Sequence, residues 1–158
     1  MAAQARDEER RLTSGLTDRA DGRESIADLR TAMQQAMEDS AGIFRTEDSL
    51  IKGVTTLREL QERSESMAVD DHSRAFNTQV VAALELSNML DVAEAIIAAA
   101  LRREESRGAH QRLDFPARDD ESYLAHSLVH RGEAGAHKVE YLPVTLTRWP
   151  PGERVYGR

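Results

Sequence analysis

Apolar residues recur at the spacing of an α-helix in three stretches of this chain. In the first, Ile26, Leu29 and Met33 lie three and four positions apart, which puts them on one face of a helix. Ser25 stands just before them, where a serine hydroxyl accepts a backbone N–H of the first helical turn. The pattern predicts a helix over about residues 25–41.

A second amphipathic stretch follows Thr46. Leu50 and Leu57 stand on its inner face, and two acidic residues at its start suit the positive end of a helix dipole. We expect a helix over about residues 46–66. Gly53 is unfavourable inside a helix, so it indicates that a neighbouring element approaches closely there.

The third and longest stretch starts at Asn77 and predicts a helix over about residues 77–106. It contains Ala95–Leu101, a run that is apolar on every side of a helix. Such a helix is normally buried on every side, and two shorter companion helices are not expected to cover it completely. We therefore expect something outside this chain to pack on that end.

The pattern changes after residue 114, where all four prolines and most of the aromatic residues stand. Two runs, YLAHSLVHR and HKVEYLPVTLT, flank a glycine-containing turn and predict a β-hairpin over about residues 123–147. Pro143 cannot donate to a strand ladder, so the second strand is expected at an edge or a bulge. The proline-rich residues beyond the hairpin predict an extended tail.

Together these elements predict a mainly α fold class. We expect residues 1–23 to form a flexible polar lead-in, and residues 24–158 to form one domain. The domain is predicted to be a three-helix bundle, spectrin-like with an up-down-up path, followed by a C-terminal β-hairpin and an extended tail. A lone hairpin is marginally stable in water, so we expect it to lie against the bundle or a partner.

Composition narrows the classes of function. The chain holds 21 basic and 28 acidic residues, and this net charge of −7 argues against nucleic acid as a partner. The absence of cysteine excludes disulfides, thiolate nucleophiles and Cys-ligated metals within the chain. The N-terminus is too charged for a signal peptide, and Ala95–Leu101, the longest apolar run, is too short to span a bilayer.

The motifs of catalysis and cofactor binding are missing. The chain has neither G-x-G-x-x-G nor G-x-x-x-x-G-K-[ST], the loops that bind nucleotide phosphates. His126 and His130 stand four residues apart, which on the predicted strand separates them by about 13 Å, too far to share an ion. Ser106 and His110 lack the surroundings of a nucleophilic serine. We expect no catalytic residue, no cofactor-binding residue and no metal ligand.

Residues 105–121, ESRGAHQRLDFPARDDE, gather charges of both signs directly after the apolar helix end. A glycine here suits the left-handed backbone of a helix cap, and arginines suit the negative end of the dipole. A charge run is most often a solvated loop, but arginine forks and carboxylates beside an apolar patch also make a docking surface. We predict domain docking and a helix cap for eight residues: Arg107, Gly108, His110, Arg112, Asp114, Arg118, Asp119 and Asp120.

From about Leu29 to its end, the chain resembles the C-terminal domain of the flavoprotein subunit of succinate dehydrogenase and fumarate reductase. The resemblance rests on LRTAMQQAMEDSAGIFRTEDSL, LRELQER, FNTQVVAALELSNMLDVAEAIIAAALRREESRGAHQRLDFPARDDESYLAHSL, EYLPV and WPPGERVYG. Arg107, Gly108 and His110 belong to the shared motif, for which the resemblance implies a structural and docking role. It implies no catalytic residue here, because the family's flavin-linked histidine and substrate-binding residues lie upstream of this region.

The resemblance also implies partners. The complete subunit holds FAD, transfers hydride between flavin and succinate or fumarate, and exchanges electrons with a separate iron–sulfur subunit. The chain alone, with no cofactor of its own, is expected to be inactive and to pack on the FAD-binding domain of the same subunit. Membrane contact is expected only through partner subunits, which implies a location in the cytoplasm or on the inner face of the cell membrane.

Other interpretations stay open at this point. L-aspartate oxidase shares the helical domain and a similar Ser-Arg-Gly motif, although the Phe-Asn-Thr start of the long helix and the Trp-Pro-Pro tail fit the succinate and fumarate branch better. A free-standing helical adaptor without chemistry is a second alternative, and a small metal-dependent enzyme is a third. The direction of the reaction is not encoded in these residues.

Overall fold

The computed structural model describes residues 2–13, 16–17, 24–73, 75–132 and 137–152. Its elements, in chain order, are α1 (Ala2–Thr13), α2 (Ile26–Ala41), β1 (Phe44–Arg45), α3 (Glu47–Ser64), α4 (Thr78–Arg102), β2 (Gln111–Arg112), α5 (Asp120–Tyr123), β3 (Ala125–Arg131) and β4 (His137–Pro143).

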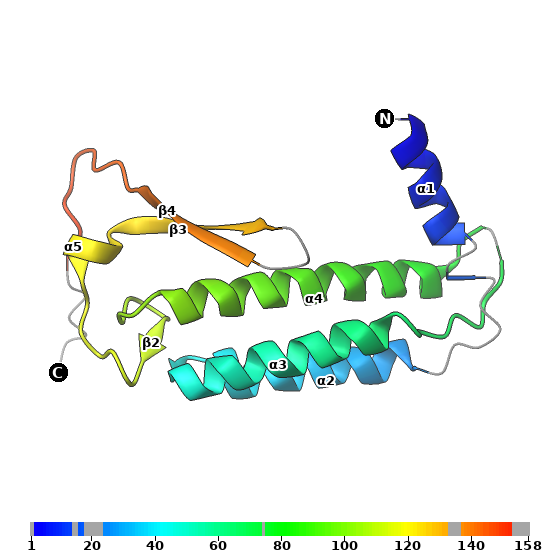
Figure 1. Ribbon diagram of the computed structural model, residues 1–158, viewed down its shortest axis with the longest axis horizontal. Coiled ribbons are helices and arrows are strands. Elements are labelled where there is room, and N and C mark those ends of the chain that lie inside the picture. Colours follow the sequence, from blue (N-terminus) through cyan, green and yellow to red (C-terminus); the bar gives the residue numbers. More distant parts are fainter. Residues whose placement is uncertain (1, 14–15, 18–23, 74, 133–136, 153–158) are drawn as a thin grey trace.

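Helices α2, α3 and α4 pack against one another along their lengths, and α4 lies between the α2–α3 pair and the β3–β4 hairpin (Figure 1). The mainly helical class with an antiparallel hairpin is therefore confirmed. The finer geometry of a spectrin-like bundle stays a prediction. The buried hydrophobic core is drawn from all three helices and the segment after α3: Leu29, Met33, Ala41, Leu50, Leu57, Leu60, Met67, Val69, Ala83, Leu86, Leu90, Ala93, Ile97 and Ala100.

Side chains of the residue before each helix fix where the three helices begin. The Ser25 hydroxyl accepts the Asp28 N–H at 3.3 Å, which confirms the predicted cap of α2. Thr46 begins α3 with a reciprocal pair of hydrogen bonds to Ser49, and Asn77 Oδ1 accepts the Val80 N–H at 3.0 Å at the start of α4. These starts depend on local sequence, which is why they were predictable.

The end of α4 differs from the expectation. The helix stops at Arg102, four residues before the predicted end, and Arg103 has an extended backbone. Within the apolar run, Ile97 is fully buried, whereas the Ile96 side chain is 46% exposed. The chain thus leaves part of this end uncovered, as the composition of the run indicated.

The hairpin lies on α4. In the ladder, Ala125 is opposite Pro143 and Arg131 is opposite His137, so Pro143 lies at the end of its strand, where it interrupts no central pairing. His137 also reaches α4, where its Nδ1 lies 3.4 Å from a carboxylate oxygen of the buried Glu94. The tip of the hairpin, residues 133–136, lies outside the described residues.

Two features of the chain go beyond the predictions. The segment expected to be a flexible lead-in, with at most a turn or two of helix, contains the 12-residue helix α1, because its Ala-, Gln-, Glu- and Arg-rich sequence has high helix propensity. The two-residue strands β1 and β2 pair in parallel, Phe44 opposite Gln111 and Arg45 opposite Arg112. The part of the chain that the structure describes contains no helix long and apolar enough to cross a membrane.

Gly53 is the point where α3 comes closest to its neighbours. A β-carbon at this position would lie 2.7 Å from Ile97 Cδ1 on α4 and would also overlap the Ser40 hydroxyl on α2. Real β-carbons do not come this close, so the predicted close approach at Gly53 is confirmed.

We expect Gly53→Ala to destabilise the chain by about 1–3 kcal/mol, because overpacking outweighs the higher helix propensity of alanine. Urea unfolding measures the change. Gly152→Ala is the control, since a β-carbon at Gly152 has no atom within 4 Å and should leave the free energy of unfolding unchanged. Equal unfolding curves for the two variants would contradict the packing seen at Gly53.

Candidate functional site

The segment after α4, residues 103–120, folds back over the C-terminal end of that helix. Arg112 is its centre, with a side chain that is 1% exposed. Its Nη1 donates to the carbonyl oxygens of Ala100, Leu101 and Arg103 at 3.2–3.3 Å. The carbonyls of Ala100 and Leu101 belong to the last turn of α4, and Arg103 is the residue directly after it. The last turn has no further helical N–H to pair with and carries the negative end of the helix dipole. Arg112 therefore caps α4.

The other side of the Arg112 guanidinium binds Asp114. Arg112 Nε and Nη2 donate to the two carboxylate oxygens at 2.7 and 2.8 Å, a bidentate pair. Asp114 also accepts the backbone N–H of Glu47, the first residue of α3, at 2.8 Å. The guanidinium beside it holds the pKa of Asp114 far below its usual range. One ion pair thus joins the negative end of α4 to the positive end of α3.

A second buried charge, Glu105, organises the opposite side of the segment. Its side chain has no exposed surface, and it accepts hydrogen bonds from the guanidinium groups of Arg103 and Arg107 and from the Asp119 N–H. Burial by itself raises the pKa of Glu105, but the bonds from Arg107, Asp119 and Arg103 outweigh it, so the pKa lies below its usual value. Glu105 is charged and fully paired.

The outer rim of the segment consists of Arg107, Arg118 and Asp120. Arg107 Nη2 donates to Asp120 Oδ1 at 2.7 Å, and Arg118 donates to both oxygens of the same carboxylate at 2.8 and 2.6 Å. The hydrogen bonds from Arg118, and then those from Arg107, lower the pKa of Asp120 to about 2. Asp120 is 43% exposed and the two arginines 27%, so this rim faces solvent in part.

Asp119 and Gly108 shape the backbone of the segment. Asp119 Oδ1 accepts the N–H groups of Glu121 and Ser122 at 2.9 Å and so begins the short helix α5. Gly108 has φ +58°, which confirms the left-handed backbone expected for it. It does not cap α4, however, and that part of the prediction is wrong. Gly108 lies in a tight turn closed by two backbone hydrogen bonds between Arg107 and His110.

His110 links the segment to the loop before α3. Arg45 Nη1 lies 2.8 Å from His110 Nδ1, and a guanidinium can only donate, so Nδ1 is the acceptor. The ring proton is then on Nε2, which donates to the Arg103 carbonyl at 3.1 Å. Burial is the largest of the effects that lower the pKa of His110, and neighbouring arginines add to it. This arrangement favours a neutral imidazole.

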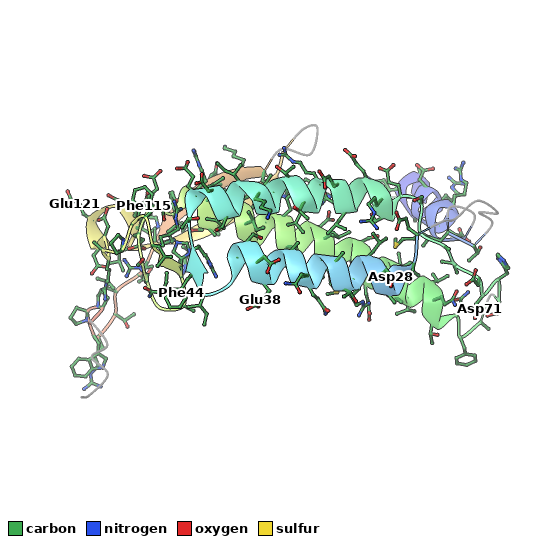
Figure 2. All side chains as sticks on the ribbon, turned by 90° about the horizontal axis from the view of Figure 1, so that it is seen from below. Asp28, Glu38, Phe44, Asp71, Phe115 and Glu121 are labelled. Atoms are coloured by element: carbon green, nitrogen blue, oxygen red, sulfur yellow. The ribbon has the colours of Figure 1, made fainter. Side chains whose placement is uncertain are left out.

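The structure brings all eight predicted residues into one region and gives them different roles. Arg112 and His110 bind the end of α4, Asp114 joins it to α3, Gly108 and Asp119 set turns, and Arg107, Arg118 and Asp120 form the rim. Figure 2 shows the region at the end of the molecule where Phe44, Phe115 and Glu121 are labelled. Sequence reasoning included Glu105 in the segment but gave it no role, and it missed Arg45. Glu105 stands two residues from Arg103 and two from Arg107, and this spacing could have predicted that its carboxylate pairs with both arginines.

The side chains of this region bind backbone groups and hold helix ends in place. Among the described residues, no buried side-chain nitrogen or oxygen lacks a hydrogen-bond partner. Within the same residues, no group of three or more His, Cys, Asp or Glu side chains is arranged to hold a metal ion. His126 and His130 lie on β3, and both are exposed. The charged groups of residues 103–120 bond to each other and to helix ends, an arrangement that positions backbone.

Comparison with known proteins places the region in context. Residues 30–156 match the family model described as the C-terminal part of the fumarate reductase flavoprotein. The whole chain is 60% identical to the fumarate reductase flavoprotein subunit of Mycobacterium tuberculosis and spans 27% of its length. It is 41% identical, over 85% of the chain and 24% of the relative, to the succinate dehydrogenase flavoprotein subunit of Rickettsia bellii. Escherichia coli quinol fumarate reductase matches 98% of the chain and 26% of its own chain, with a TM-score of 0.88 at 42% identity.

We expect Arg112→Met to destabilise the chain by about 3–5 kcal/mol, because it leaves a carboxylate and three carbonyl groups without their partner. Urea unfolding tests this against Arg131→Met. Arg131 also pairs with an aspartate, Asp91, but its side chain is 65% exposed, so the loss should be much smaller. Similar losses of unfolding free energy in the two variants would show that burial does not determine how much the Arg112–Asp114 pair contributes to stability.

A second prediction concerns pH. Because the folded-state pKa of His110 lies below its ordinary value of about 6.5, the unfolded chain binds the proton first. His110 therefore contributes stability above pH 6.5 that is lost as the pH falls through its folded-state pKa. We expect the difference in unfolding free energy between wild type and His110→Gln to shrink on going from pH 7.5 to pH 5. A difference that stays constant would mean that His110 has an ordinary pKa.

Proposed function

The chain belongs to the C-terminal domain family of fumarate reductase and succinate dehydrogenase flavoprotein subunits, and from this premise we propose that it packs on the FAD-binding domain of such a subunit. In this role it supports assembly with the iron–sulfur subunit. The whole enzyme would catalyse succinate and fumarate oxidoreduction. The single observation that carries the proposal is 60% identity over the full chain to a protein of which the chain spans only 27%.

We propose that the flavin site lies outside this chain. Its sequence has no glycine-rich loop for a pyrophosphate, and the arginines of the candidate site are already bonded to carboxylates and carbonyl groups. We therefore assign the FAD and the hydride transfer to the remainder of the subunit. By itself the chain is proposed to be inactive, with membrane contact only through partner subunits.

The surface left open by the fold supports a docking role. Val92 and Ile96 on α4 are 58% and 46% exposed, and Leu113 beside the capped helix end is 61% exposed. Exposed apolar side chains, together with the partly exposed charges of Arg107, Arg118 and Asp120, fit a surface that binds another protein domain. Arg112 is not on this surface, because it is buried within the chain.

Three finer points belong to the same proposal. The bundle is proposed to have spectrin-like packing of α2, α3 and α4, and residues 24–158 are proposed to act as one domain. The location is proposed to be the cytoplasm or the inner face of the cell membrane, as part of a complex. The high identity to a fumarate reductase subunit favours this branch over L-aspartate oxidase and over a free-standing adaptor.

The test uses the complete flavoprotein subunit expressed with its iron–sulfur partner. We expect Arg107→Ala to reduce the amount of assembled, flavin-containing enzyme, because it leaves the buried Glu105 with one fewer partner and opens the rim. Per bound flavin, single-turnover flavin reduction by succinate should change little. Lys138→Ala, which removes an exposed charge from the hairpin, is the control.

If Arg107→Ala enzyme assembles with normal flavin content but its flavin reduction step falls by about a thousandfold, Arg107 stabilises the transition state and the docking role is wrong.

A further inference from the structure

Phe76, at the end of the loop before α4, combines two unfavourable states. Its side chain is 100% exposed to solvent, and its backbone has φ +56°. Among the described residues it is the one non-glycine residue with a positive φ. A bulky L-residue in the left-handed region is strained, and an aromatic ring in water gives up the free energy of burial. Strain of this kind persists only where the surroundings impose it.

Hydrogen bonds impose the conformation of this loop. The Asn77 side chain donates to the carbonyl groups of Asp71 and Ser73, while its Oδ1 caps α4. Gln79 Oε1 accepts the N–H groups of Asp70 at 2.7 Å and Asp71 at 3.1 Å. The loop is therefore tied to the first turns of α4 on both sides of Phe76, and the aromatic ring is presented on a fixed backbone.

The part of the chain that precedes the bundle reaches the same loop. His72 Nδ1 is hydrogen-bonded to the Thr17 carbonyl group, and Glu24 pairs with the segment after α3 through backbone bonds to Ser66 and Ala68. Figure 1 shows α1 and the connection between α3 and α4 at the same end of the bundle. The chain that leads into this domain thus arrives beside Phe76.

We propose that Phe76 is an anchor residue that inserts into the portion of the flavoprotein subunit that precedes this chain. The curated relative with 60% identity is nearly four times as long as the chain, which matches its C-terminal part. In a subunit of that length, the portion before this domain would connect through the segment that contacts the Phe76 loop. Aromatic side chains held rigidly at a surface carry much of the binding energy of protein interfaces. The inference rests on the proposed function and names one contact within it.

Phe44 provides a comparison at the other proposed docking surface. It has the same side chain, is 70% exposed, and lies on β1 at the other end of the bundle, next to the candidate site. It lacks the positive φ of Phe76 and is remote from the contact between His72 and Thr17. If both ends of the bundle pack on the rest of the subunit, the two positions contact different parts of it.

The direct test places the photoreactive amino acid p-benzoylphenylalanine at position 76 or at position 44 of the complete subunit, assembled with its iron–sulfur partner. After irradiation, mass spectrometry maps the crosslinked peptides. We expect position 76 to crosslink to peptides that precede this chain in the same subunit, and position 44 to crosslink to different peptides. Identical peptides from both positions, crosslinks from position 76 to the iron–sulfur subunit or a second copy, or no crosslink from position 76 would overturn the inference.

A second test uses the sign of a stability change. Asparagine tolerates a positive φ better than phenylalanine, so Phe76→Asn should raise or preserve the unfolding temperature of the complete subunit if the ring stays in water. We expect it to lower that temperature, because the docked ring is lost. An increase for Phe76→Asn would overturn the inference. If it fails while Arg107→Ala still impairs assembly, the proposed function stands without this anchor.

Discussion

The ion pair between Arg112 and Asp114 is the constraint on which the candidate site depends. It closes two helix ends of opposite polarity at once, since Arg112 binds the last carbonyl groups of α4 and Asp114 binds the first N–H of α3. Arg112 is 1% exposed and Asp114 28%, so the arginine is the buried member of the pair. Removing Asp114 would leave a buried guanidinium without its carboxylate, and removing Arg112 would leave the last carbonyl groups of α4 without their donor.

Glu105 extends the same logic to the outer part of the segment. A buried carboxylate among two arginines and a backbone N–H fixes Arg107, and Arg107 in turn holds Asp120 on the rim. In the sequence these charged residues suggested a docking surface. In the structure their exposure varies, from the buried Glu105 and Arg112 to the more exposed Asp120. Asp120 is 43% exposed and Arg107 and Arg118 are 27% exposed, and hydrogen bonds among them already hold their side chains. A partner that bound this rim would therefore lose little entropy in fixing it.

Local and non-local information explain what the sequence could and could not predict. The helix starts at Ser25, Thr46 and Asn77 were predictable, because each depends on a side chain bonding to a backbone N–H three residues away. The end of α4 was placed too late, because its cap comes from Arg112, nine to twelve residues beyond the carbonyl groups it binds. The positive φ of Gly108 followed from its residue type, but its place in a turn closed by backbone hydrogen bonds between Arg107 and His110 did not. The pairing of β1 with β2 joins residues 67 positions apart and leaves no local pattern.

The two surfaces with a proposed docking role lie at opposite ends of α4, which has 25 residues and is therefore about 38 Å long. At one end, buried charges order a polar rim; at the other, a strained loop presents one aromatic ring. Groups this far apart with no shared partners affect stability independently. A domain that made only one of these contacts could pivot about it, whereas contacts at both ends of a rigid helix fix its orientation. The packed core between them, with α4 in contact with α2, α3 and the hairpin, is what makes that helix rigid enough to hold both.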